Sequence, residues 1–254
     1  MSGHSKWASI KRQKGVNDSR RGQLFTKLGR EIAVAAREGG PDPEMNFRLR
    51  LVLDKAKQAN MPKDNIDRAI KRGSGEGSDG AQMEEHTYEG YGPHGTAMIV
   101  QVVTDNRNRT VSEVRHAFSR YGGNLGSDGS VAWMFSRQGV VTISAEDDDA
   151  SDEIALVAID AGAADVETAE GVVTVYTEMS DFKAVQEALT GSGYAVTDAQ
   201  LSWIPQSQMT LDEREAMTTL KLMDALEELD DVQEVFSNLD ISDELLAKFE
   251  NEAA

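Results

Sequence analysis

The sequence predicts an α+β protein in which a helical N-terminal domain precedes two small α/β domains. Apolar residues follow a helical period up to about residue 72, and β-branched runs begin after the glycine-rich stretch "GSGEGSDG" at 73–80. The segment 139–204 then reads β-α-β-β-α-β, which is the ferredoxin-like order. A second unit of this kind starts before that segment and is completed after Pro205. We therefore expect one ferredoxin-like α/β domain inserted into another.

Three helices are expected in the first 75 residues. In the first, apolar residues recur every four positions, at Leu24, Leu28, Ile32 and Ala36. The second is expected to begin after Asp42 as its N-cap, with Pro43 at the first helical position. A short third helix covers about 63–72 and stops before Gly73. We interpret the three as a packed group behind an irregular basic arm.

The α/β elements follow from β-branched runs, glycines and caps. The outer unit is predicted to have a strand at 96–104, a helix at 109–123 and a strand at 130–135. After Pro205, Thr210 and Glu213 form a capping box before a helix at 211–229, and a final strand follows at 231–239. The inserted unit is predicted to have strands near 139–143, 164–169, 172–178 and 194–204, with helices near 150–161 and 181–190.

These elements divide the chain into four parts. The predicted parts are a basic N-terminal helical domain with a flexible arm at 1–75, an outer ferredoxin-like domain at 81–137 plus 206–241, an inserted acidic ferredoxin-like domain at 138–205, and a C-terminal tail helix at 242–254.

Charge is distributed very unevenly along the chain. The formal net charge is −18, yet residues 1–75 hold 17 Lys and Arg against 8 Asp and Glu. Residues 138–254 hold 4 against 28. Such asymmetry indicates different partners for different parts, and a basic first third is expected to attract a polyanion such as nucleic acid. The acidic remainder repels that polyanion and limits how the chain approaches it.

Composition excludes several classes of protein. The chain has no Cys, which excludes disulfides, Cys-ligated metal centres and thiol catalysis. It has no apolar run long enough to span a bilayer and no signal-peptide core, so we expect a cytoplasmic protein with no membrane partner. No phosphate-binding loop, histidine pair or nucleophilic triad is evident. We expect no enzyme activity, no catalytic residues, no metal, no cofactor and no small-molecule substrate.

The basic arm gives the strongest positive signal. Trp7 lies among its cations, where an aromatic ring either stacks on an exposed base or packs on the helices behind it. Some of these cations could instead pair with acids on the helix face. The predicted nucleic-acid contacts of this region are Lys6, Trp7, Lys11, Arg12, Lys14, Arg20, Arg21, Lys27 and Arg30.

A second basic cluster lies in "TDNRNRTVSEVRHAFSRYGG". Arg107 and Arg109 stand at the start of a predicted helix, where backbone N–H groups favour phosphate. We include both in the predicted nucleic-acid interface. Ion pairing with the acidic body of the protein is an equally good explanation of this cluster.

Long blocks of the sequence resemble one family. The blocks "GHSKWASIKRQKG", "RGQLFTKLGREI", "AKQANMPKDNIDRAIKRG", "YEGYGPHGTAMIV", "DNRNRTVSEVRHAFSRYGGNLGSDGSVAWMF" and "DVQEVFSNLDIS" are similar to those of the YebC/PmpR family. That family also includes a mitochondrial translational activator of cytochrome c oxidase. The resemblance covers nearly the whole chain and is weakest in wording over the acidic insert, about 145–200.

The resemblance implies two alternative functions. The first is a bacterial transcriptional regulator that binds DNA through the basic N-terminal domain. The second is a factor that associates with the ribosome and its RNA and relieves stalling on proline-rich stretches. The predicted helices carry few residues at base-reading spacing, which favours backbone contact over sequence readout. The arm's charge does not distinguish DNA from ribosomal RNA, because phosphate contacts position a protein without identifying its target.

Overall fold

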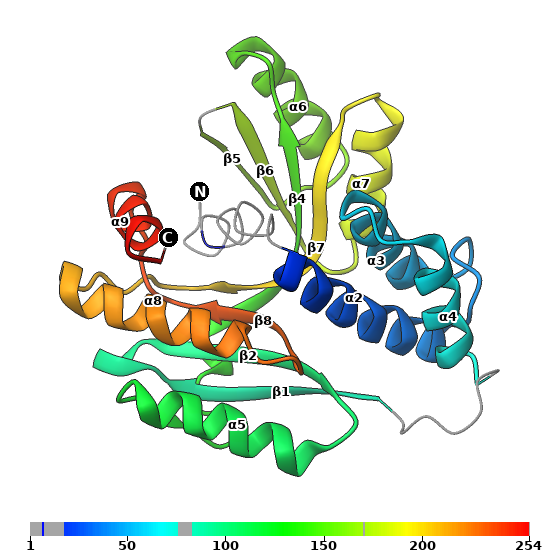
Figure 1. Ribbon diagram of the computed structural model, residues 1–254. Coiled ribbons are helices and arrows are strands. Elements are labelled where there is room, and N and C mark those ends of the chain that lie inside the picture. Colours follow the sequence, from blue (N-terminus) through cyan, green and yellow to red (C-terminus); the bar gives the residue numbers. More distant parts are fainter. Residues whose placement is uncertain (1–6, 8–17, 76–82, 170, 254) are drawn as a thin grey trace. The chain divides into compact units, whose positions relative to one another are not determined.

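The computed structural model describes residue 7 and the ranges 18–75, 83–169 and 171–253, with side chains omitted at 18–20 and 253. It divides into two compact units (Figure 1). One is Phe135–Ile204, and the other combines the chain before it with the chain after it. The predicted α+β class is confirmed: a helical N-terminal region is followed by two sheet-containing domains, one inserted into the other. Residues 18–75 share a unit with the outer α/β domain, so the boundary at 75 stays a prediction.

The helical region consists of α2 (Asp18–Gly39), α3 (Phe47–Gln58) and α4 (Lys63–Gly73) around one small core. Ile32 and Leu49 are completely buried there. Gly73 lets α4 approach α2 closely, because a Cβ at this position would lie 2.2 Å from the Ala33 carbonyl oxygen. This close contact fixes the last turn of α4 against the middle of α2.

The expected start of α3 is wrong. Asn46, not Asp42, is the N-cap, and its side chain accepts a hydrogen bond from the Leu49 N–H. Residues 43–46 instead form a turn in which the Asn46 N–H donates to the Asp42 carbonyl. The Asn46 amide also donates to the carbonyls of Ala35 and Gly40, so one buried side chain ties α3 to the end of α2.

The outer α/β domain has a four-stranded antiparallel sheet in the order β3-β1-β2-β8. Its elements are β1 (Glu84–Tyr91), β2 (Ala97–Thr104), α5 (Arg107–Arg120), β3 (Asn124–Leu125), α8 (Glu213–Glu227) and β8 (Val232–Ser237), followed by α9 (Asp243–Ala253).

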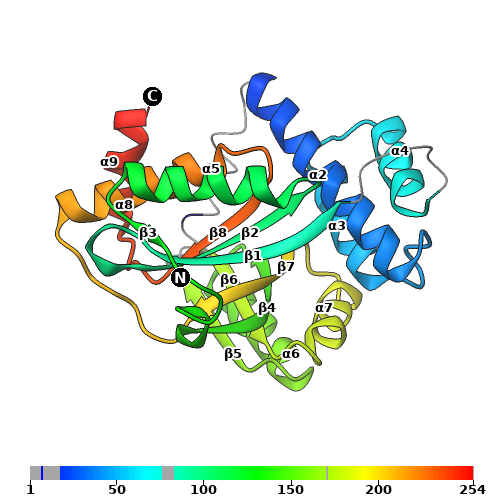
Figure 2. The same ribbon diagram turned by 90° about the horizontal axis from the view of Figure 1, so that it is seen from below.

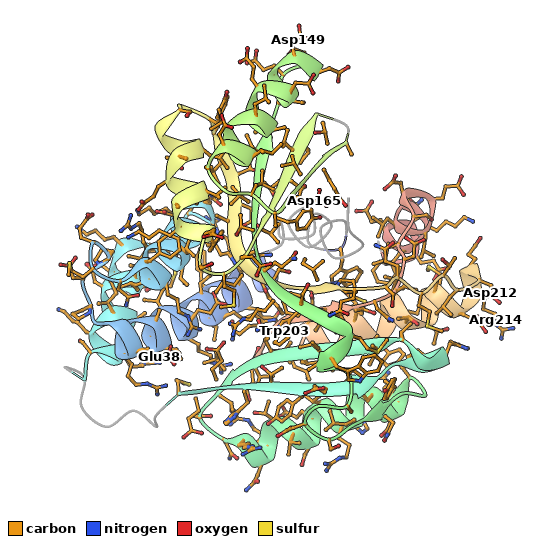
Figure 3. The ribbon with its side chains drawn as sticks, turned by 180° about the vertical axis from the view of Figure 1, so that it is seen from behind. Glu38, Asp149, Asp165, Trp203, Asp212 and Arg214 are labelled. Carbon is orange, nitrogen blue, oxygen red and sulfur yellow. The ribbon has the colours of Figure 1, made fainter. Side chains whose placement is uncertain are left out.

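The inserted domain has the regular ferredoxin-like arrangement. Its sheet order is β5-β6-β4-β7, the spatial order of a ferredoxin-like fold. Its elements are β4 (Phe135–Ser144), α6 (Asp148–Asp160), β5 (Asp165–Ala169), β6 (Val172–Thr177), α7 (Phe182–Gly191) and β7 (Val196–Pro205). Asp149 stands at the first turn of α6, and Asp165 and Trp203 mark β5 and β7 (Figure 3).

The two domains have the same spatial order but different chain order. In the inserted domain the third strand along the chain lies between the first and second. In the outer domain that place belongs to β1, which comes first in the chain, so the outer domain reaches the same sheet order with a permuted strand order along the chain. Figure 2 shows β1 beside β2, with α5 running along this sheet.

Two predictions about the outer domain are wrong. The strand expected at 130–135 is a short 3-10 helix, Ala132–Met134, and β4 starts only at Phe135. Asp212, rather than Thr210, caps α8 by accepting from the Glu215 N–H. The sequence analysis also missed β1, because "EEHTYEGY" is polar and glycine-containing, and only three of its residues are buried.

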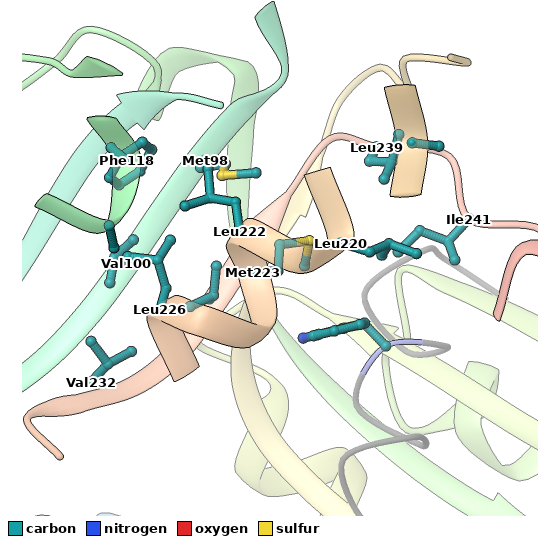
Figure 4. Packing of buried hydrophobic residues seen from close by; sticks show 14 of the residues in the cluster. Met98, Val100, Phe118, Leu220, Leu222, Met223, Leu226, Val232, Leu239 and Ile241 are labelled. Atoms are coloured by element: carbon teal, nitrogen blue, oxygen red, sulfur yellow. The ribbon is translucent and has the colours of Figure 1, made fainter. Parts of the chain in front are cut away.

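One face of the outer sheet carries the largest core. Met98 and Val100 of β2 pack with Phe118 of α5 and with Leu220 and Leu226 of α8 (Figure 4). All five side chains are completely buried. The core therefore fixes the C-terminal half of α5 against the sheet, and with it the orientation of the helix that carries the arginines.

Candidate nucleic-acid interface

Two of the predicted contact arginines meet at one buried carboxylate. Asp231 lies just before β8 and is only 2% exposed. Arg30 of α2 donates to its Oδ1 at 2.8 Å, and Arg109 of α5 donates to its Oδ2 at 2.8 Å. The second of the oxygens also accepts from the buried hydroxyls of Thr110 and Thr104, at 2.6 and 3.2 Å. Asp231 therefore joins α2, β2 and α5.

Protonation follows from these contacts. Burial alone raises the pKa of Asp231, but the hydrogen bonds from Thr110 and Arg109, together with the charge of Arg30, outweigh it and lower the pKa. The pKa of Arg109 is raised, first by Asp231 and then by Asp105. The network is thus fully charged near neutral pH. Within it, Arg30 and Arg109 bind a carboxylate of their own protein.

Other cations of the helical region also contact the outer α/β domain. The Lys27 ammonium donates to the Glu227 carbonyl, and the Lys27 residue is only 9% exposed. Arg37 donates to the Met83 carbonyl, and Arg48 bridges Glu38 and Glu85 at 2.6 Å each. Much of the positive charge counted in residues 1–75 is therefore directed at the protein's own acids and carbonyls.

Trp7 is buried. Only 2% of it is exposed, and its indole N–H donates to Glu227 at 2.9 Å. Its ring packs against Phe249 of α9 with 5.5 Å between centroids. Of the two interpretations that the sequence allowed for this side chain, the structure contains the packed one.

The remaining predicted residues are placed as follows. Lys6, Lys11, Arg12 and Lys14 lie outside the described residues, as does the side chain of Arg20. Arg21 is exposed on α2, with its guanidinium 5.6 Å from the Phe25 ring centroid. Arg107 is exposed at the first residue of α5. Burial raises the pKa of the neighbouring Tyr88, and Arg107 acts in the opposite direction.

Sequence reasoning missed the cations of α4. Lys63, Arg68, Lys71 and Arg72 are all exposed, while Ala69 and the flanking isoleucines face the helical core. Among the described residues, none forms an ion pair or hydrogen bond with these four side chains. A signal was available, since the apolar positions of "KDNIDRAIKRG" leave Arg68, Lys71 and Arg72 on the opposite side of a helix.

The outward face of α5 is a second exposed basic surface. Arg115, His116 and Arg120 are exposed there, whereas Val114, Ala117 and Phe118 face the core. Glu113 is the one acid within the helix. The basic cluster of the sequence analysis therefore has two parts. Arg109 pairs with Asp231 of the same protein, whereas Arg115, His116 and Arg120 face outward.

Comparison with known proteins agrees with this architecture. The model of the TACO1/YebC protein N-terminal domain matches residues 5–76, and that of the TACO1/YebC second and third domain matches residues 83–239. The chain belongs to the TACO1/YebC family. The first model covers the basic helical region, and the second covers both α/β domains of this family member.

Full-length relatives carry a regulatory name. A "probable transcriptional regulatory protein" of Herpetosiphon aurantiacus is 53% identical over 98% of both chains. One of Dehalococcoides mccartyi is 51% identical over 100% of both. The crystal structure of a conserved hypothetical protein from Aquifex aeolicus superposes with a TM-score of 0.82 at 48% identity, covering 90% of this chain and 94% of that one.

The described part of the chain lacks two further features. In it, no helix combines the length and apolar character needed to cross a bilayer. Over the same ranges, no three His, Asp or Glu side chains gather in a way that could hold a metal ion.

Proposed function

We propose that this protein is a cytoplasmic transcriptional regulator that binds duplex DNA through its basic N-terminal domain. The names of its relatives as probable transcriptional regulatory proteins support the regulatory role. The DNA contact is our inference from the distribution of cations. It includes the arm residues Lys6, Lys11, Arg12, Lys14 and Arg20 from the sequence analysis, and it adds the outward face of α4.

The observation that carries the proposal is the difference between two sets of cations. Lys27 and Arg30 are directed at carbonyls and a carboxylate of the outer domain. Arg68, Lys71 and Arg72 point away from the core and have no anionic partner among the described side chains. Exposed cations without internal partners are those that can neutralise phosphates and release counterions. We assign Lys27, Arg30 and Arg109 to domain docking and α4 to DNA.

The proposal predicts backbone contact with little base readout. Asp64 and Asp67 on the same helix reduce its positive charge, but the outward face of α4 with Arg68, Lys71 and Arg72 stays net positive. The large negative charge of the inserted domain makes that domain itself repel phosphate. Binding should therefore be strongly dependent on salt and weakly dependent on sequence.

The test uses full-length protein and fluorescence anisotropy with a labelled duplex over a range of salt. Replacing Arg68, Lys71 and Arg72 by Gln should reduce the log–log salt slope by about 2 to 3 and weaken binding alike on unrelated sequences. The matched control replaces Lys183, Lys221 and Lys248 by Gln, which changes the net charge by the same amount. These lysines lie outside α4, and each pairs with a Glu of the protein. Equal behaviour of the two triple variants would refute the assignment of α4.

The nucleic acid that the protein binds in cells distinguishes the transcriptional proposal from the alternative, a ribosome-associated factor. Crosslinking followed by sequencing should recover promoter DNA in preference to ribosomal RNA. Recovery of ribosomal RNA alone would replace the transcriptional proposal by the translational one.

A further inference from the structure

The loop between β3 and β4 exposes the largest aromatic surface among the described residues. Trp133 is 68% exposed, and Tyr91, at the end of β1, is 38% exposed. Both donate to one oxygen: the Tyr91 hydroxyl lies 3.0 Å and the Trp133 indole nitrogen 3.1 Å from the Ser130 carbonyl. The polar atoms of both rings are therefore already satisfied, and by one shared acceptor.

A buried carboxylate holds this loop in place. Glu89 of β1 is 8% exposed and accepts from the backbone N–H groups of Gly129, Val131 and Ala132, at 2.7, 2.8 and 2.7 Å. Its own carbonyl accepts from the Gly126 N–H. Burial raises the pKa of Glu89, but the three N–H groups outweigh it and the pKa is lowered. The loop is thus held on both sides of Ser130 by a carboxylate that is charged near neutral pH.

This arrangement is unusual for a side chain that only fills space. An exposed Trp loses apolar contact with the protein, yet here its orientation is fixed by a hydrogen bond and by the ordered backbone beneath it. Because the indole N–H is occupied, the ring offers its faces rather than its donor. Such a surface suits stacking of a planar group and not hydrogen-bond readout.

Cations continue from this aromatic pair along α5. Asn124 of β3 pairs with Tyr91, and β3 follows the end of α5 after a short glycine turn. Arg120, in the last turn of that helix, lies with its guanidinium 5.8 Å from the Tyr121 ring centroid. Arg115 and His116 are exposed on the preceding turns. The exposed cations of α5 thus lead, through β3, to the end of β1 that carries Tyr91.

We propose that Trp133 and Tyr91 form a stacking platform for an unpaired base of single-stranded nucleic acid, with Arg115 and Arg120 contacting its phosphates. Aromatic platforms beside a basic track are the usual means of binding single strands, because every base has a π-face. Bases inside a duplex are already stacked, so the platform selects unpaired ones. The inference deepens the proposed function, because it assumes that the protein binds nucleic acid, but it uses a surface distinct from α4.

The test measures anisotropy of fluorescein-labelled oligothymidylate and oligouridylate of about twelve nucleotides on the full-length protein. Trp133→Ala should weaken binding of single strands about tenfold, because it removes the stacking surface for one base. Trp133→Phe should retain most of the affinity, because it keeps a ring. Leu156→Ala, which truncates a side chain that is 63% exposed on α6, is the matched control and should have no effect.

The outcomes separate the two proposals. Loss of single-strand binding by Trp133→Ala, with duplex binding unchanged, supports the platform whatever the α4 variants do. Wild-type affinity of Trp133→Ala for both oligonucleotides, or an equal loss for duplex and single strands, overturns it. Absence of measurable binding of either oligonucleotide to the wild-type chain at low salt also overturns it. The relative affinity of the two oligonucleotides identifies DNA or RNA as the natural source of the strand.

Discussion

Replacement of Asp231 should loosen the helical region from the outer α/β domain. Its side chain is 3% exposed and accepts from Arg30, Arg109 and two threonines. Asp231→Asn keeps the shape but removes the charge and turns an amide donor toward a guanidinium. The change leaves buried hydrogen-bonding groups without their acceptor, which is the costly way to break such a network.

The size of the expected loss in stability follows from how exposed each partner of Asp231 is. Arg109 is 43% exposed and also pairs with Asp105, so its contribution is about 0–1 kcal/mol. Arg30 is 16% exposed, and the Thr110 hydroxyl is completely buried, so their bonds to Asp231 contribute most. We expect a loss of about 3 kcal/mol in the free energy of unfolding of this unit. For a unit of this size the melting temperature should fall by roughly 6–12 °C.

The assay is urea unfolding followed by circular dichroism, together with amide hydrogen exchange of α2. Asp230→Asn is the control, because this exposed neighbour contributes its carbonyl rather than its carboxylate to Arg30. A double-mutant cycle of Arg30→Gln with Asp231→Asn should give a coupling of about 1–2 kcal/mol. If Asp231→Asn and Asp230→Asn unfold at the same urea concentration, the buried network does not hold the helical region and the reasoning fails.

Two further perturbations test other parts of the fold. Glu89→Gln should destabilise the outer domain by about 2 kcal/mol at neutral pH relative to the exposed Glu84→Gln control. Because the pKa of Glu89 is lowered on folding, the extra stability of the wild type over Glu89→Gln should be complete above about pH 5 and disappear as the pH falls through the folded pKa. A stability difference that stays constant at acid pH would contradict this expectation. Gly73→Ala should be destabilising, since its Cβ would meet the Ala33 carbonyl, whereas Gly22→Ala on exposed α2 should stabilise by about 0.5–1 kcal/mol; equal melting temperatures would contradict the close approach.

Most of the fold could be predicted because periodicity reports local structure. The strand and helix order of the inserted domain was predicted from alternating β-branched runs and glycines. The permutation could not be recognised, because β1 owes its place to pairing on both sides and not to its own composition. Half of "EEHTYEGY" is solvent-facing or glycine, which gives a weak local signal.

The candidate site was predicted less well, for a physical reason. Counting charge identified the basic region, but charge is local in sequence while partners are not. Arg30 and Arg109 meet Asp231 across 201 and 122 residues, and no spacing rule reports such a contact. For the same reason the sequence could not show the partner of Trp7, because Glu227 is 220 residues away. By contrast, the exposed face of α4 is a local property and could have been read from its sequence.

The permuted order of the outer sheet has a consequence for synthesis of the chain. β1 and β2 emerge together and pair at once, but β8 follows roughly 130 residues later, after the whole inserted domain. At translation rates of about 5–20 residues per second, the β2 edge waits on the order of 6 to 26 s for its neighbour. During that interval the apolar face of β2 lacks α8 as well, so it is the segment most exposed to wrong pairing. The inserted domain is complete before this edge is covered, and β8 closes, late in synthesis, a sheet that β1 began.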